Sequence, residues 1–198
     1  MTVETPARFS PLAAWQDSFA RLPTGLQVRE LPFLAQLTLR VEPGSPAAEA
    51  VEACLGITLP GPVRAELSGD VKLLWMGPDE WLLVAPDGRQ QDLVAQLRSA
   101  IGDDGFATVT DVSAQRTTLA LSGHLVRKVL AQGCAIDLDP RVTPVGSCLN
   151  TLLAQAPVTL VVRGEGASGV WLLVRASFAS YLATWLLDAC TEYRGSTG

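Results

Sequence analysis

The sequence contains little charge and a single histidine. Charged residues make up 18% of its 198 residues, below the roughly 25% usual for soluble domains. The only lysines are Lys72 and Lys128 and the net charge is −5, so the chain lacks the basic patch with which proteins bind nucleic acid. The one histidine, His124, has no cysteine or aspartate at a metal-ligand spacing and no GxSxG serine to activate. We therefore expect no catalytic residue, no metal site and no cofactor site in this chain.

Long apolar runs and paired cysteines are also missing. No segment reaches the roughly 18 consecutive apolar residues that cross a bilayer, although 48% of the residues are hydrophobic. The excess apolar surface must lie either in a large core or at a permanent protein interface, and both remain open. The N-terminal residues Met1–Pro6 have neither the charged nor the apolar segment of a signal peptide, so we expect a cytoplasmic protein without a membrane partner.

The cysteines do not form a disulfide or zinc pattern. They are scattered, with no CxxC pair, at Cys54, Cys134, Cys148 and Cys190. A zinc site requires ligands in pairs at short spacing. In a reducing compartment, isolated cysteines of this kind behave as small buried hydrophobic residues.

What the sequence does contain is one pattern that occurs twice. The run Trp81-Leu82-Leu83-Val84 recurs as Trp171-Leu172-Leu173-Val174. A residue suited to capping a helix follows each run, Asp87 after the first and Ser177 after the second. An apolar segment with helical periodicity then closes each unit. This repetition indicates an internal duplication.

Hydrophobic periodicity divides the chain into two similar halves. Residues 1–25 form a loose arm (1–9) and a short helix, residues 26–104 the first half, residues 105–190 the second half, and residues 191–198 a flexible tail. Each half has two strands, a helix ending at a glycine (Gly56 or Gly133), an optional strand, a hairpin and a closing helix. We predict an α+β fold in which two related β-β-α-β-β-α halves form a two-layer single domain.

The expected elements follow the apolar patterns closely. The expected strands lie at 28–31, 35–41, 71–76, 80–85, 107–112, 117–121, 149–154, 158–163 and 170–175. The expected helices lie at about 12–22, 46–55, 93–101, 125–130 and 178–189.

One polar cluster stands out, at the turn that follows the strand expected at 107–112. Asp111 lies at the end of that strand and Arg116 follows five residues later, so the two could orient a small polar ligand. The alternative, which we favour, is that Asp111 accepts hydrogen bonds from the turn and forms an ion pair with Arg116.

Tryptophans supply the candidate interface residues. Trp75 and Trp81 flank one hairpin, and Trp15 lies on the first short helix. Core packing is the ordinary role of tryptophan. Aromatic residues are also enriched at the energetic centres of protein interfaces, so we name these three as interface candidates.

Several segments resemble the gamma subunit of heterotetrameric sarcosine oxidase. They are Ser10–Leu12, Trp75–Val84, Asp111–Thr117, Gly133–Leu138 and Ser177–Leu186. They occur in order from about residue 10 to about residue 190, so the resemblance covers nearly the whole chain. One departure is Asp139, where the family pattern leads us to expect histidine.

The resemblance implies a fold like the folate-binding domain of the glycine cleavage T-protein. It implies an accessory subunit of an αβγδ complex, with the alpha subunit as the expected direct partner alongside beta and delta. The complex would convert sarcosine to glycine, hydrogen peroxide and a one-carbon unit carried by tetrahydrofolate. FAD, FMN, NAD, tetrahydrofolate and zinc would all belong to the other subunits. The alternative is a free-standing folate-binding protein of the T-protein type, with Asp111 and Arg116 in its site.

Overall fold

The computed structural model describes residues 7–103, 106–164 and 169–193. The start of the predicted arm and the end of the predicted tail, residues 1–6 and 194–198, lie outside the described residues. The described chain forms two five-stranded antiparallel sheets. Sheet A has the order β1-β7-β10-β9-β8, and sheet B has the order β3-β4-β5-β2-β6.

The elements agree with the expected ones to within a few residues. The strands are β1 (Gln27–Leu31), β2 (Ala35–Arg40), β3 (Ala65–Glu66), β4 (Lys72–Gly77), β5 (Glu80–Ala85), β6 (Thr108–Asp111), β7 (Arg116–Ser122), β8 (Cys148–Leu153), β9 (Ala156–Val162) and β10 (Gly169–Arg175). The α-helices are α1 (Gln16–Phe19), α2 (Pro46–Leu55), α3 (Gln90–Ile101), α4 (Val126–Leu130) and α5 (Ala179–Ala189). Short 3-10 turns lie at Ala13–Trp15, Ala176–Phe178 and Thr191–Tyr193.

The two halves have the same order of elements. From β1 to α3 and again from β6 to α5 the chain runs β-β-α-β-β-β-α, so the optional strand is present in both. The sheets also correspond strand by strand, except that the first strand of each half is exchanged: β1 pairs with β7, and β6 pairs with β2. The boundary that we predict between residues 104 and 105 therefore does not separate the two sheets. Each sheet borrows one strand from the other segment.

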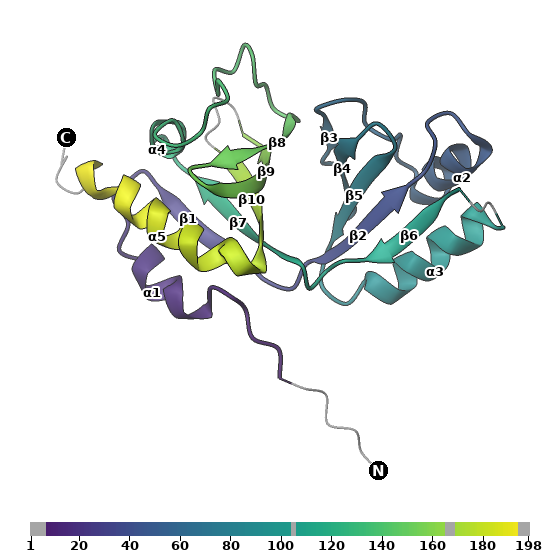
Figure 1. Cartoon of the computed structure of the whole chain (residues 1–198), viewed down its shortest axis with the longest axis horizontal. Coiled ribbons are helices and arrows are strands. Elements are labelled where there is room, and N and C mark those ends of the chain that lie inside the picture. Colours follow the sequence, from purple (N-terminus) through teal and green to yellow (C-terminus); the bar gives the residue numbers. More distant parts are fainter. Residues whose placement is uncertain (1–6, 104–105, 165–168, 194–198) are drawn as a thin grey trace.

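The helices cover the outer face of each sheet, and the inner faces meet (Figure 1). The helix-side core of sheet A includes Leu160, Leu172 and Leu186, and that of sheet B includes Val51, Leu83 and Leu97. The inter-sheet cluster consists of Leu74, Leu82, Val84, Val112, Cys148, Val161, Trp171 and Leu173. Each sheet and the helices that cover it form two layers, so the described chain stacks as helix, sheet, sheet, helix, rather than in the two layers predicted for the whole domain. Consecutive apolar residues in β5 and β10 make this possible, because alternate side chains face opposite sides of a strand.

The repeated Trp-Leu-Leu-Val runs face opposite ways. Trp81 packs in the helix-side core of sheet B, whereas Trp171 packs in the inter-sheet cluster. A shift of one residue moves every side chain of a strand to the other face. The four identical letters are therefore not structural equivalents, and the order of elements is the stronger sign of two related halves.

The predicted helix caps after these runs are wrong. Neither α3 nor α5 has a side-chain cap hydrogen bond. Asp87 instead accepts hydrogen bonds from Arg8, at 2.9 and 3.0 Å. By contrast, α2 has the expected start, because the Ser45 hydroxyl accepts a hydrogen bond from the Ala48 N–H at 3.2 Å.

Candidate functional site

Asp111 and Arg116 line one cleft of about 500 Å³ where the chain passes from sheet B to sheet A. Asp111 is the last residue of β6 in sheet B, and Arg116 is the first residue of β7 in sheet A. The turn between them therefore connects the two sheets. Phe9 and Phe33 supply apolar walls to the same cleft. The structure thus brings together the two residues that the sequence singles out.

Their interaction differs from the expected one. The Asp111 carboxylate accepts hydrogen bonds from the Ser113 N–H at 2.9 Å and from the Ser113 hydroxyl at 2.5 Å, which confirms its role in the turn. The expected ion pair is wrong: within the described residues no ion pair joins Asp111 to Arg116. The Arg116 guanidinium instead lies 3.5 Å from the Gln115 side-chain oxygen.

Arg116 is a half-buried cation with a lowered pKa. Burial is the main cause, and the positive charge of Arg175 lowers the pKa further, while Glu80 raises it. Arginine still remains charged at any physiological pH. Arg116 therefore carries a charge that the structure around it compensates only in part.

The N-terminal segment lies against this cleft. Arg8 forms an ion pair with Asp87 at 2.9 Å, and its guanidinium lies 4.1 Å from the centre of the Phe33 ring. The Ser10 hydroxyl donates a hydrogen bond to the buried Glu30 carboxylate, which also accepts one from Thr117 at 2.5 Å. These contacts attach the N-terminal segment to the first half.

The tryptophan candidates differ in how much surface they offer. Trp81 is 3% exposed, and its indole N–H donates to the Pro60 carbonyl at 2.9 Å. Trp75 is half-buried and lines a cleft of about 530 Å³ together with Trp81 and Pro78. Trp15 is half-buried against the helix-side core of sheet A. Contact of these residues with a partner stays a prediction, for which Trp81 offers the least surface.

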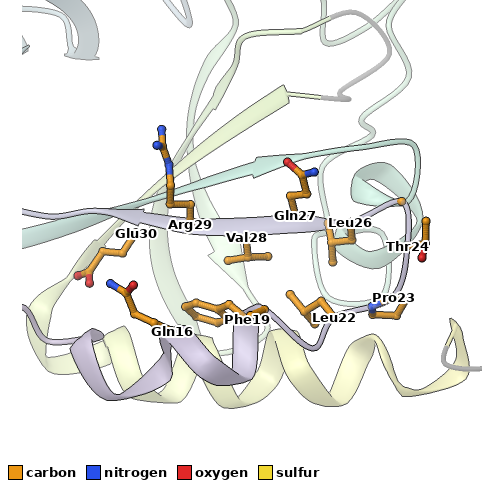
Figure 2. A pocket seen from close by; sticks show the side chains of 12 residues that line it. Gln16, Phe19, Leu22, Pro23, Thr24, Leu26, Gln27, Val28, Arg29 and Glu30 are labelled. Carbon is orange, nitrogen blue, oxygen red and sulfur yellow. The ribbon is translucent and has the colours of Figure 1, made fainter.

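A further cleft of about 450 Å³ lies between α1 and the edge strand β1. Figure 2 shows Phe19 and Leu22 on one side of it and Val28 on the other. Glu30, at the end of this row, is 5% exposed. This opening was missed from sequence, because no residue pattern marks which strand becomes a sheet edge.

The described chain offers no metal cluster. Within residues 7–103, 106–164 and 169–193, no group of three histidine, cysteine, aspartate or glutamate residues could hold a metal ion. His124 is exposed, and its ring packs where a Cβ at Gly25 would lie. The same part of the chain contains no helix long and apolar enough to cross a membrane.

The cysteines only partly follow the expectation of burial. Cys148 and Cys190 are buried, whereas Cys134 is half-buried and Cys54 is exposed. Burial raises the pKa of the Cys148 thiol to about 12, so this group stays protonated and is a poor nucleophile. Its sulfur donates to the Trp75 carbonyl at 3.4 Å across the two sheets.

The fold of the chain is similar to that of a solved aminomethyltransferase. The solved structure of glycine cleavage system aminomethyltransferase T from Bartonella henselae aligns with a TM-score of 0.60 over 86% of this chain and 48% of that protein. At 17% identity this likeness shows the fold alone. It agrees with the T-protein-like fold that the sequence predicts.

The chain belongs to the sarcosine oxidase gamma subunit family. The family model described as "Sarcosine oxidase, gamma subunit family" matches residues 40–192. The sarcosine oxidase subunit gamma of Corynebacterium sp. (strain P-1) is 38% identical over 194 residues, covering 96% of this chain and 93% of that protein. The Arthrobacter sp. subunit gamma is 36% identical, covering 98% of this chain and 95% of that protein.

A solved complex gives the same result in three dimensions. A chain of heterotetrameric sarcosine oxidase from Corynebacterium sp. U-96, in complex with pyrrole 2-carboxylate, aligns with a TM-score of 0.87 at 36% identity. The alignment covers 96% of this chain and 98% of that one. The resemblance noted from the sequence is thereby confirmed.

Proposed function

We propose that this chain is the non-catalytic gamma subunit of a heterotetrameric sarcosine oxidase. The observation that carries the proposal is the alignment along almost the full length of both chains with a subunit of such a complex, at a TM-score of 0.87. The alignment covers 96% of this chain and 98% of that one, so no large segment of either is left unmatched. The chain therefore does in its own complex what its structural counterpart does in the solved one.

In this proposal the chemistry takes place on other subunits. Sarcosine is oxidised to glycine with formation of hydrogen peroxide, and the one-carbon unit passes to tetrahydrofolate. FAD, FMN, NAD, tetrahydrofolate and zinc are held by the alpha, beta and delta subunits, and the assembly is cytoplasmic. What supports this division is the side-chain chemistry of the described residues: an exposed lone His124 and a Cys148 thiol that burial keeps protonated.

The role of the chain is then to pack against a partner, with the alpha subunit as the first candidate. Obligate interfaces bury on the order of 2,000 Å² or more and are rich in apolar side chains. Phe9 is 85% exposed beside the Asp111–Arg116 cleft, and Leu152 is 53% exposed on sheet A. Apolar side chains in such positions are what a permanent partner would cover.

Purification of the tagged chain from its native cells tests the proposal. The expected result is that three other subunits co-elute with this chain, and that flavin absorbance elutes in the same fractions. A colourless chain that elutes alone would refute it. Calorimetry with tetrahydrofolate would then test the alternative of a free-standing folate-binding protein, with Arg116→Ala as the variant expected to abolish binding.

A further inference from the structure

Two arginines lie side by side at the end of the β7–β10 pair. Arg116 and Arg175 are directly opposite each other in the antiparallel ladder. Alternate residues of a strand share a face. On the face that carries the two arginines, the next pairs along the ladder are Thr118 with Leu173 and Ala120 with Trp171. Leu173 and Trp171 belong to the inter-sheet cluster. The two guanidinium groups therefore start from the inner face of sheet A, at its rim.

Both arginines line one cleft of about 360 Å³. Its other walls combine neutral polar groups, Asn150 and Thr159, with the apolar Pro157. The Asn150 side chain is fixed in place, because its oxygen accepts from the Thr159 hydroxyl at 2.8 Å and its amide donates to the Met76 carbonyl at 3.3 Å. The cleft thus has a rigid, uncharged side and a cationic side.

The described residues place no acidic group in an ion pair with either of these two positive charges. Like charges placed directly opposite each other destabilise a sheet, and Arg175 indeed contributes to the lowered pKa of Arg116. In the part of the chain that the structure describes, neither arginine forms an ion pair. Glu80 acts on Arg116 only at longer range, and it lies 3.7 Å from the Arg40 guanidinium.

A buried hydroxyl group on the same face, that of Thr118, lacks a hydrogen-bond partner among the described residues. The Thr118 hydroxyl is fully buried and has no hydrogen-bond partner among the described residues. It lies two residues along β7 from Arg116, on the same side of the strand. Buried polar groups are normally satisfied, so this end of sheet A has unmet polar groups in addition to its paired positive charges.

We propose that Arg116 and Arg175 form a binding site for a carboxylate. Planar guanidinium forks match the geometry of a carboxylate and hold it through charge-assisted hydrogen bonds. The apolar wall at Pro157 and Leu173 suits the short aliphatic stem that carries such a group. The carboxylate comes either from a free small acid or from an acidic side chain of a neighbouring subunit. The two arginines belong to this chain alone; the free-acid source is independent of the proposed function, whereas the partner source rests on it.

The first arm of the test titrates the purified full chain with glutarate, a free dicarboxylate with a short apolar stem, at constant ionic strength. For a free acid, wild-type protein should show saturable binding, and Arg175→Gln and Arg116→Gln should each weaken it at least tenfold. The matched control is Arg29→Gln, which changes an exposed arginine of sheet A that lines a different cleft. Arg175→Gln should remain folded, with an unfolding midpoint equal to or above that of wild type, because one of two repelling charges is gone.

The second arm measures assembly of the chain with its co-purifying partners. If glutarate does not bind, but Arg175→Gln weakens assembly at least tenfold while Arg29→Gln does not, the carboxylate belongs to a partner side chain. The proposal is overturned if neither arm responds to Arg175→Gln, or if Arg29→Gln has the same effect, which would indicate general charge screening. If the chain proves to have no partner, the glutarate arm alone decides.

Discussion

Gly56 and Gly133 follow equivalent helices, α2 and α4, but the two halves of the molecule use glycine for different reasons. Gly56 has a left-handed backbone with φ of 64°, and a Cβ there would meet nothing within 4 Å. Gly133 is not among the residues with positive φ. A Cβ at Gly133 would instead lie 2.5 Å from the Trp185 ring and 3.1 Å from the Ala154 nitrogen. Glycine is therefore needed for a left-handed backbone in the first half, and to leave room for the Trp185 ring in the second.

The two repeated tryptophans, Trp81 and Trp171, likewise have different surroundings in the two sheets. Trp81 is fixed by a loop carbonyl beneath the helices of sheet B, whereas Trp171 lies between the sheets with the Arg163 guanidinium 4.0 Å from its ring centre. The related order of elements has been kept in the two halves, while the contacts that stabilise each half differ. Matched substitutions in the two halves should therefore have different consequences.

The largest effects are expected for the tryptophans. Trp81→Ala and Trp171→Ala should each lower the free energy of unfolding by about 3–5 kcal/mol, the usual cost of removing a buried aromatic side chain. Hydrogen exchange should separate them: Trp81→Ala should deprotect α2 and α3, and Trp171→Ala should deprotect the inner strands first. Identical exchange patterns for the two variants would contradict the assignment of opposite faces.

The glycines come next. Gly133→Ala should cost about 1–3 kcal/mol through overpacking against Trp185. Gly56→Ala should cost about 1–2 kcal/mol, since a left-handed conformation is unfavourable for residues with a Cβ. Asparagine tolerates this conformation, so Gly56→Asn should recover part of the loss in urea unfolding, whereas Gly133→Asn should be at least as harmful as alanine. Recovery at both positions would mean that the distinction is wrong.

The helix starts should show a smaller difference. Ser45→Ala should lower the free energy of unfolding by about 1 kcal/mol, because it removes the side-chain cap of α2. Ser177→Ala removes no cap hydrogen bond and should stay within about 0.5 kcal/mol of wild type. Thermal unfolding of both variants provides the measurement, and an equal loss would restore the predicted cap at Ser177.

The smallest effect concerns the contact of the N-terminal segment with the first half. The Arg8 guanidinium lowers the pKa of Asp87 below its ordinary value, through a hydrogen bond and its charge. The stabilisation by the Arg8–Asp87 contact is present above the pKa of Asp87 in the unfolded chain, about 4. It is lost as the pH falls through the lower pKa of Asp87 in the folded protein. Asp87→Asn should therefore be slightly less stable than wild type at pH 7, and the difference should vanish in acid. Asp70→Asn, which removes an exposed loop carboxylate, is the control for loss of one surface charge.

Much of the fold could be predicted from the sequence, because local signals are strong in this chain. The strand expected at 35–41 and the helix expected at 46–55, with its end at Gly56, rest on local patterns, and the structure confirms them. Which strands pair is not local. The exchange of β1 and β6 between the sheets depends on contacts that no window of sequence contains. The two-residue strand β3 carries too little pattern to be placed with certainty.

The candidate site could be predicted only in part, for a related reason. Asp111 and Arg116 attract attention because they are close in sequence, and they do line one cleft. The residue that faces Arg116 across the ladder is Arg175, which is distant in sequence and identified only through strand register. Asp139, the departure from the family pattern, forms ion pairs with Arg141 at 3.0 Å and Arg127 at 3.4 Å. Hydrogen bonds from Arg141 are the main cause of the lowered pKa of Asp139, and the charges of Arg141 and Arg127 lower it further.

We propose that this chain acts by packing into a sarcosine oxidase rather than by chemistry of its own. The most direct test co-expresses the partner subunits with and without this chain and measures both the assembled flavoprotein and its sarcosine-dependent peroxide production. Omission of the chain should abolish assembly of the heterotetramer, and the isolated chain should produce no peroxide. A flavoprotein that assembles and turns over sarcosine equally well without this chain would contradict it.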